Sequence, residues 1–207
     1  FVQQPARADD QPVVVNCSFE LEWCEAMRVK YEQVTGKKAV IARKTDGEIL
    51  AEAKAEADNP RFDVWQSAGP DVAAIANQEG LLESYKSPML PQLHDWAQKA
   101  AAATNYTLTP IYTGVIGFGY NTELLNKKGL PEPKCWADLI TPAYKGEIQM
   151  ADPSTSGTAL TMVTTILELM GEDKGFEYLK ALNKNINQYT RSGTAGIKAA
   201  ARGETLI

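Results

Sequence analysis

A loop rich in small hydroxyl-bearing residues is the clearest chemical signal in the sequence, and it reads Asp152-Pro153-Ser154-Thr155-Ser156-Gly157-Thr158. Backbone N–H groups and hydroxyls placed before a helix can bind an anion, as they do in phosphate-binding loops. The lysine of a nucleotide-hydrolysing loop is missing, so the pattern indicates anion binding without hydrolysis. A plain helix N-cap with spare serines is the alternative. The candidate ligand-binding residues of this loop are Ser154, Thr155, Ser156 and Thr158.

Arg191 is the candidate cation, because a guanidinium can hold a carboxylate or phosphate through two parallel hydrogen bonds. An exposed arginine before a helix is the alternative. Further candidates follow the predicted strands of the first half of the chain, since ligands of open parallel sheets bind at the carboxyl ends of strands. They are the backbone of Cys17 and Ser18, the side chains of Thr45 and Ser67, and Tyr112 near an expected hinge.

Alternating strands and helices are predicted to position these candidate residues. Short β-branched or apolar runs predict strands, and apolar residues at helical spacing predict the helices between them. The expected strands are 12–16, 39–42, 62–66, 147–150 and 186–189, with another beginning at 205–207. Thr45 and Glu48 form a predicted capping box, and residues 90–103 are predicted to be helical. The order of elements predicts an α/β fold with parallel sheets.

A long extended stretch over residues 106–120 is broken by one proline and three glycines, as a strand that crosses and flexes between lobes would be. We therefore predict a first α/β lobe over 11–108 and a second over 109–207, entered through a hinge near 109–114. Residues 1–10 are expected to be the end of a signal peptide or a disordered leader, because Ala6-Arg7-Ala8 has the form of a cleavage site.

Composition excludes several classes of protein. The 207 residues carry a net charge of −5, which is opposite to the basic surplus of nucleic-acid binders. No stretch approaches the roughly 20 apolar residues of a membrane-spanning helix. The single histidine, His94, lies beside no nucleophile motif, and the three cysteines cannot make a four-ligand zinc site. We therefore expect a binding protein rather than an enzyme, without a cofactor or a metal.

Cys17 and Cys24 give information about the cellular compartment of the protein. They lie seven residues apart, one at the end of a predicted strand and the other in the next predicted helix. They could close a small disulfide, which would persist in an oxidising compartment such as the periplasm. Two buried free thiols are the alternative. Cys135 is expected to be a free thiol without function.

Several motifs, in this order and spacing, resemble the periplasmic solute-binding proteins of ABC importers, in the class grouped with ferric-ion binders. They are Gly117-Phe118-Gly119-Tyr120-Asn121, Cys135-Trp136-Ala137-Asp138-Leu139, Pro142-Ala143-Tyr144-Lys145-Gly146, the loop 152–158, Gly171-Glu172 and Ala201-Arg202-Gly203-Glu204. The resemblance implies a two-lobed fold of type 2, truncated here at the C-terminus because family chains continue beyond position 207. It also implies a monomeric, periplasmic, hinge-closing receptor that delivers a solute to an inner-membrane permease.

The resemblance leaves the solute open. The loop 152–158 and Arg191 suit a small anion of organophosphate or phosphonate type, captured between the lobes. Ferric iron is the alternative, although iron-binding relatives use tyrosines from a stretch that would follow Ile207, and Glu20 is the only hard ligand near the first-strand loop. The effector-sensing domain of a transcription regulator and a carboxylate-pair hydrolase are the alternatives from other classes.

Overall fold

The computed structural model describes residues 11–67 and 69–207. The predicted leader or signal-peptide end at residues 1–10 therefore lies outside the described residues. Contacts divide the chain into two compact units, the first ending at residue 68 and the second running from Gly69 to Ile207. This division differs from the expected lobe boundary at 108/109, which stays a prediction. Each unit is described here by itself.

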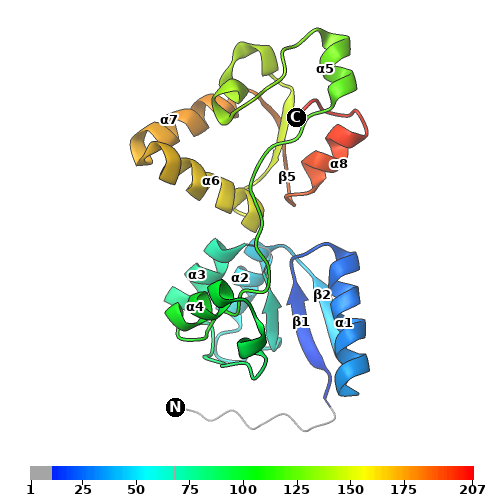
Figure 1. Cartoon of the computed structure of the whole chain (residues 1–207), viewed down its shortest axis with the longest axis vertical. Helices are drawn as coiled ribbons and strands as arrows, with labels where there is room; N and C mark the ends of the chain where they lie inside the picture. Colours follow the sequence, from blue (N-terminus) through cyan, green and yellow to red (C-terminus); the bar gives the residue numbers. More distant parts are fainter. Residues whose placement is uncertain (1–10, 68) are drawn as a thin grey trace. The chain divides into compact units, whose positions relative to one another are not determined.

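The first unit is a parallel sheet with two helices. Its elements are β1 (Val13–Cys17), α1 (Leu21–Thr35), β2 (Ala39–Arg43), α2 (Asp46–Ala55) and β3 (Val64–Gln66). β1 lies in the centre, in the order β2-β1-β3, and both pairings are parallel (Figure 1). The carboxyl ends of all three strands consequently meet at one edge of this sheet.

Local sequence determines where the helices of the first unit begin and end. α1 ends at Gly36, whose φ of 70° is a left-handed conformation that glycine adopts without a steric penalty. α2 begins with the predicted capping box: the Thr45 side chain accepts the Glu48 N–H, and the Glu48 carboxylate accepts the Thr45 N–H at 2.8 Å. Both boundaries are therefore explained by residues within one helical turn of them.

Cys17 and Cys24 form a disulfide that joins the end of β1 to the first turns of α1. Both cysteines are fully buried and pack with Phe19, which is 8% exposed. Of the two alternatives for this pair, the structure has the bridge. The third cysteine, Cys135, is exposed and free.

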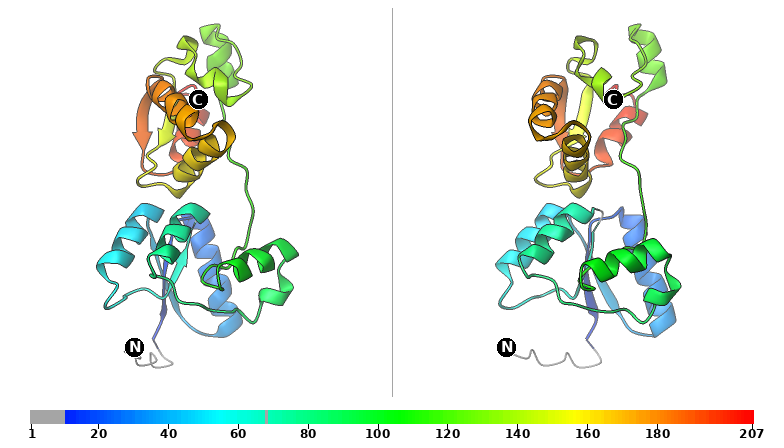
Figure 2. Two further views of the ribbon diagram at one scale, coloured as in Figure 1. Left: turned by 90° about the vertical axis from the view of Figure 1, so that its left-hand side faces the viewer. Right: turned by 60° about the vertical axis from the view of Figure 1, so that its left-hand side comes forward.

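The second unit contains the remaining elements. They are α3 (Pro70–Gln78), η1 (Leu90–Gln92), α4 (Asp95–Ala103), α5 (Thr122–Lys128), η2 (Trp136–Ile140), η3 (Pro142–Tyr144), β4 (Ile148–Ala151), α6 (Gly157–Met170), α7 (Glu172–Asn183), β5 (Ile186–Thr190) and α8 (Ala195–Ala201). β4 and β5 pair in parallel, and the views in Figures 1 and 2 place α6 and α7 on one face of this pair and α8 on the other. The fold is thus the α/β class that the sequence predicts.

The sheet of the second unit continues beyond β4. The N–H of Ile207 donates to the Glu147 carbonyl at 3.0 Å, and its carbonyl accepts the Gln149 N–H at 2.8 Å. This is the hydrogen-bond pattern of a parallel pairing, so residues 205–207 run along β4, although they are assigned to no strand. The sequence predicts the start of a strand here but not its neighbour. Leu206 and Ile207 are buried in the main apolar core, together with Ile166 of α6.

Two segments differ from the sequence prediction. The expected helix over 90–103 is interrupted, because η1 ends at Gln92 and α4 begins only after His94, whose ψ of 152° is extended. His94 is exposed, as expected for an ordinary surface residue. The segment 108–121 is assigned to no strand, although the Asn121 N–H donates to the Leu206 carbonyl at 2.8 Å. The glycines and the proline of this segment explain why it forms no strand. Glycine has no side chain to pack on a sheet, and proline has no N–H to donate to a neighbouring strand.

Asn121→Ala tests how α5 is attached. The Asn121 side chain accepts the Leu124 N–H at 2.9 Å and donates to the Ala200 carbonyl of α8 at 2.7 Å. Losing a cap and one partly buried hydrogen bond should lower the free energy of unfolding by about 1–2 kcal/mol, measured by urea denaturation. Asn126→Ala, on the exposed side of the same helix, is the matched control and should change it by less than about 0.5 kcal/mol. Equal effects of the two changes would contradict the role of Asn121.

Candidate ligand-binding residues

The carboxyl edge of the β1–β3 sheet brings four sequence-predicted residues together. Cys17 ends β1, Ser18 follows it, Thr45 follows β2, and Ser67 follows β3. We call these four residues the first-unit cluster. Their common position follows from the parallel pairing of all three strands, as the sequence argument requires.

Several N–H, carbonyl and hydroxyl groups of the first-unit cluster form hydrogen bonds within the protein. The Ser18 N–H donates to the Gln66 carbonyl at 2.9 Å, and the Cys17 carbonyl accepts the Lys44 N–H at 3.0 Å. The Thr45 hydroxyl donates to the Glu48 carboxylate at 2.9 Å. These particular backbone and hydroxyl groups therefore shape the edge of the sheet. The ligand contacts that we predict for Cys17, Ser18 and Thr45 stay a prediction.

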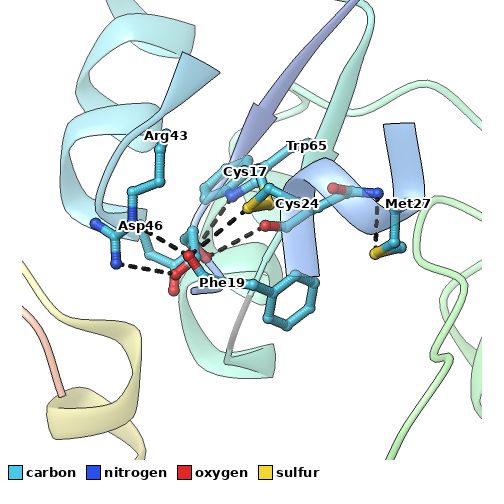
Figure 3. The surroundings of a disulfide bond; sticks show 9 residues. Cys17, Phe19, Cys24, Met27, Arg43, Asp46 and Trp65 are labelled. Atoms are coloured by element: carbon cyan, nitrogen blue, oxygen red, sulfur yellow. Dashed lines mark hydrogen bonds between the residues drawn. A yellow bond between two sulfur atoms is a disulfide. The ribbon is translucent and has the colours of Figure 1, made fainter. Parts of the chain in front are cut away.

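Asp46 is a polar residue at this edge that the sequence argument did not single out. Its side chain is 2% exposed, and its Oδ1 accepts hydrogen bonds from Trp65 Nε1 at 3.1 Å and from the Ser67 hydroxyl at 3.0 Å. Figure 3 shows Asp46 and Trp65 beside the disulfide. A buried carboxylate needs such partners, because desolvation penalises its charge. Asp46 thus holds Trp65 and Ser67 in position.

The loop 152–158 and the segment around Arg191 come together in the second unit. The Thr155 hydroxyl donates to the Arg191 carbonyl at 3.2 Å, and the Asp152 N–H donates to the Thr190 carbonyl at 2.8 Å. A Cβ on Gly193 would lie 2.7 Å from the Thr158 side chain, so the two segments touch there. We call Ser154, Thr155, Ser156, Thr158 and Arg191 the second-unit cluster. They follow β4 and β5, the two paired strands of this unit.

Asp152 organises this loop. Its carboxylate accepts the Ser154 N–H at 2.8 Å and the Ser154 hydroxyl at 2.7 Å. Its carbonyl accepts the N–H groups of Thr155 and Ser156 at 3.1 and 2.9 Å. The Ser154 hydroxyl, with the Ser154 N–H after it, lowers the pKa of Asp152. Asp152 therefore remains charged at neutral pH and keeps the loop folded around itself.

The N-terminus of α6 is the part of this loop that is open to an anion. Three of the amides that the sequence argument offered, those of residues 154–156, donate to Asp152. Within the described part of the chain, the N–H groups of Gly157 and Thr158 have no protein acceptor. The Ser156 hydroxyl caps the helix by accepting the Ala159 N–H at 3.3 Å. Anion binding at this cluster would thus use the first turn of α6 rather than the whole loop.

Tyr112 lies on the extended segment 108–121 of the second unit and is 40% exposed. Its predicted contact with a ligand near a hinge stays a prediction. In the described ranges, no three His, Cys, Asp or Glu residues are grouped so that they could hold a metal ion. No helix built from those residues is long and apolar enough to cross a membrane.

Parallel strands with helices between them and polar loops after the strands define the class of α/β proteins. The comparison with known proteins narrows this class: a model of the bacterial extracellular solute-binding proteins matches residues 60–206. The chain belongs to this family. The resemblance noted on the sequence motifs is therefore confirmed, and so is the expectation of a binding protein rather than an enzyme.

Three known proteins illustrate the relationship. The periplasmic binding protein AfuA from Actinobacillus pleuropneumoniae, solved with exogenous fructose-6-phosphate bound, is 42% identical with a TM-score of 0.90, over 94% of this chain and 61% of AfuA. The phosphoglycerate transport regulatory protein PgtC of Salmonella typhimurium is 33% identical, over 56% of this chain and 32% of PgtC. Iron-bound HitA from Pseudomonas aeruginosa is 18% identical with a TM-score of 0.69, over 94% of this chain and 61% of HitA, and shows the fold alone. The chain thus spans less than two thirds of each of these proteins.

Proposed function

We propose that the protein is an extracytoplasmic receptor of an ABC importer that binds a small phosphorylated solute and delivers it to a membrane permease. The observation that carries the proposal is the 42% identity, over nearly the whole chain, to a binding protein solved with fructose-6-phosphate. The name of PgtC points to a phosphorylated compound as well. Binding without covalent chemistry is the activity that we assign, by a receptor that acts as a monomer.

The second-unit cluster supports an anionic solute. The first turn of α6 offers the N–H groups of Gly157 and Thr158 and the positive end of a helix of 14 residues. Arg191 is exposed on the neighbouring segment, which the Thr155 hydroxyl holds in place. A phosphoryl group fits this combination, because it accepts several hydrogen bonds and carries negative charge.

The disulfide supports an extracytoplasmic location. Bridges such as Cys17–Cys24 form and persist in oxidising compartments and are rare in the cytoplasm. This agrees with the extracellular solute-binding family and with the proposed periplasmic location. A cytoplasmic sensing domain of a transcription regulator would not be expected to depend on such a bridge.

Thermal unfolding of the full-length protein with a small ligand panel tests the proposal. Fructose 6-phosphate or 3-phosphoglycerate at 100 times the dissociation constant should stabilise the protein by about 2.7 kcal/mol and raise Tm by about 5–10 °C. Fructose, which lacks the phosphoryl group, should give no shift at the same concentration. A shift with ferric citrate alone would overturn the phosphorylated-solute assignment in favour of iron.

A matched pair of variants locates the binding site in the same experiment. Arg191→Gln should weaken binding of the phosphorylated ligand about 10-fold or more, because one charge-assisted hydrogen bond contributes about 1.5–3 kcal/mol. Arg202→Gln is the control, since Arg202 forms an exposed ion pair with Glu204 at 2.6 Å. An unchanged affinity in Arg191→Gln would remove Arg191 from the site.

A further inference from the structure

Arg43 ends β2 at the same edge of the first-unit sheet as the first-unit cluster. Its Nε donates to the Phe19 carbonyl at 3.1 Å, and its Nη2 donates to the Ser18 carbonyl at 3.5 Å. Figure 3 shows the Arg43 side chain reaching toward Phe19. Two backbone carbonyls from one short turn therefore hold the guanidinium, and they hold it at the edge where ligands of parallel sheets bind.

The charge of Arg43 is not balanced within the described ranges. Arg28, Arg61 and Arg202 each pair with a glutamate. Arg43 forms no ion pair in residues 11–67 and 69–207, and its two hydrogen bonds go to neutral carbonyls. A guanidinium has five N–H donors in a planar fork, so three of them have no protein acceptor there.

The turn that holds Arg43 is itself fixed. Ser18 and Phe19 lie inside the loop that the Cys17–Cys24 bridge closes. The Ser18 N–H is bound to the Gln66 carbonyl of β3, and Phe19 is 8% exposed. The two carbonyls that accept from Arg43 are thus placed before any ligand arrives. An arginine held in this way loses little freedom when it binds, which favours affinity.

Asp46, an acidic residue of the same edge, binds other groups. Asp46 is buried, and its Oδ1 is bound by Trp65 and Ser67. The guanidinium of Arg43, by contrast, belongs to an exposed residue. Its remaining N–H donors match a solute with a pair of anionic oxygens, as a phosphoryl or carboxylate group presents.

We infer that Arg43 is a ligand-binding residue of the first unit, which binds a phosphoryl or carboxylate group of the solute through its unused N–H donors. The inference rests on the proposed function and deepens it, because it assigns a cationic contact with the solute to the first unit. It also assigns a task to the disulfide-closed turn, which positions Arg43 through the carbonyls of Ser18 and Phe19.

Calorimetric titration of full-length variants tests the role of Arg43. Arg43→Gln should weaken fructose 6-phosphate binding about 10-fold or more if a phosphoryl group is the partner. If a carboxylate is the partner, only 3-phosphoglycerate should lose affinity. Arg43→Lys keeps the charge but not the planar fork, so its affinity should fall between those of Arg43→Gln and the unmodified protein. Arg61→Gln is the matched control, because it removes the same charge from an exposed position before β3. It should change the affinity for either ligand less than about 2-fold.

The outcomes separate this inference from the proposed function. Unmodified protein that binds a phosphorylated ligand, with unchanged affinity in Arg43→Gln, would overturn the role of Arg43 and leave the function standing. Unmodified protein that binds neither phosphorylated ligand would overturn both. If Arg43→Gln does not fold, Arg43→Lys tests the inference. A lysine variant that binds both ligands with the affinity and salt dependence of the unmodified protein would contradict the inference, which requires the planar guanidinium of Arg43.

Discussion

Cys17→Ala/Cys24→Ala should lower the free energy of unfolding by about 2.5 kcal/mol, which is the loop-entropy contribution of a short bridge such as this one. For a protein of this size, Tm should fall by about 5–10 °C. The physical reason is that the unfolded chain regains the freedom that the bridge removes, while the folded chain loses a buried covalent link between β1 and α1. Circular dichroism during thermal unfolding measures the effect.

Cys135→Ser is the matched control for the disulfide prediction, because Cys135 is exposed and free, and a serine hydroxyl can replace its thiol at the N-cap of η2. It should leave Tm within about 2 °C, in keeping with a surface change of less than about 0.5 kcal/mol. Unmodified protein treated with a reductant after unfolding, and then refolded in it, should melt like the double variant. A double variant that melts at the unmodified temperature would contradict the stabilising role of the bridge.

Local sequence signals predicted much of this fold because their causes are local. The capping box of Thr45 and Glu48 and the left-handed Gly36 lie within a few residues of the helix ends that they determine. The prediction of one continuous helix over 90–103 was wrong for an equally local reason. Pro91 lies in a 3₁₀ turn and His94 is extended, so the apolar spacing continued across a real break in the backbone.

Residues whose role depends on distant partners escaped the sequence argument. Asp46 is buried because Trp65 and Ser67, about twenty positions further along, donate to it. Arg43 is held by carbonyls of Ser18 and Phe19 on another strand's loop. Neither arrangement leaves a spacing pattern, because the order β2-β1-β3 that creates it is a property of the whole sheet.

Asp152 is a residue whose role could have been predicted from its spacing to Ser154. The sequence argument treated the amides of residues 154–156 as available to an anion, whereas all three donate to Asp152. An aspartate two residues before a serine commonly accepts the backbone N–H two positions on. The motif therefore contained the evidence that this loop is tied to its own aspartate, and that the first turn of α6 is what remains for a ligand.

Asn185→Ala should be the most destabilising of the substitutions considered, at about 3 kcal/mol. Asn185 is 4% exposed, and its side-chain amide donates to the carbonyls of Leu139 and Thr141 at 2.7 and 2.8 Å. Alanine leaves the Leu139 carbonyl without its donor, which costs about 1–3 kcal/mol for a buried acceptor. It also removes one hydrogen bond to the Thr141 carbonyl, which still accepts the Tyr144 N–H at 3.2 Å, and this loss costs about 1 kcal/mol. Tm should fall by about 6–12 °C, and Trp136 of the neighbouring η2 segment reports the transition by fluorescence.

Asn185→Asp separates the lost donors from the lost volume, since aspartate has nearly the same shape. Its carboxylate would face two carbonyl oxygens, so its folded-state pKa should be raised above the unfolded value. The folded state then binds more protons than the unfolded state, and the stability of Asn185→Asp should rise as the pH falls from 7 toward 4. Asn187→Ala, an exposed amide that donates to Gly146 and Thr205, is the matched control and should cost less than about 1 kcal/mol. A loss in Asn185→Ala no larger than in Asn187→Ala would show that the Leu139 carbonyl finds another donor, and the buried amide would not be what joins η2 and η3 to the β4–β5 sheet.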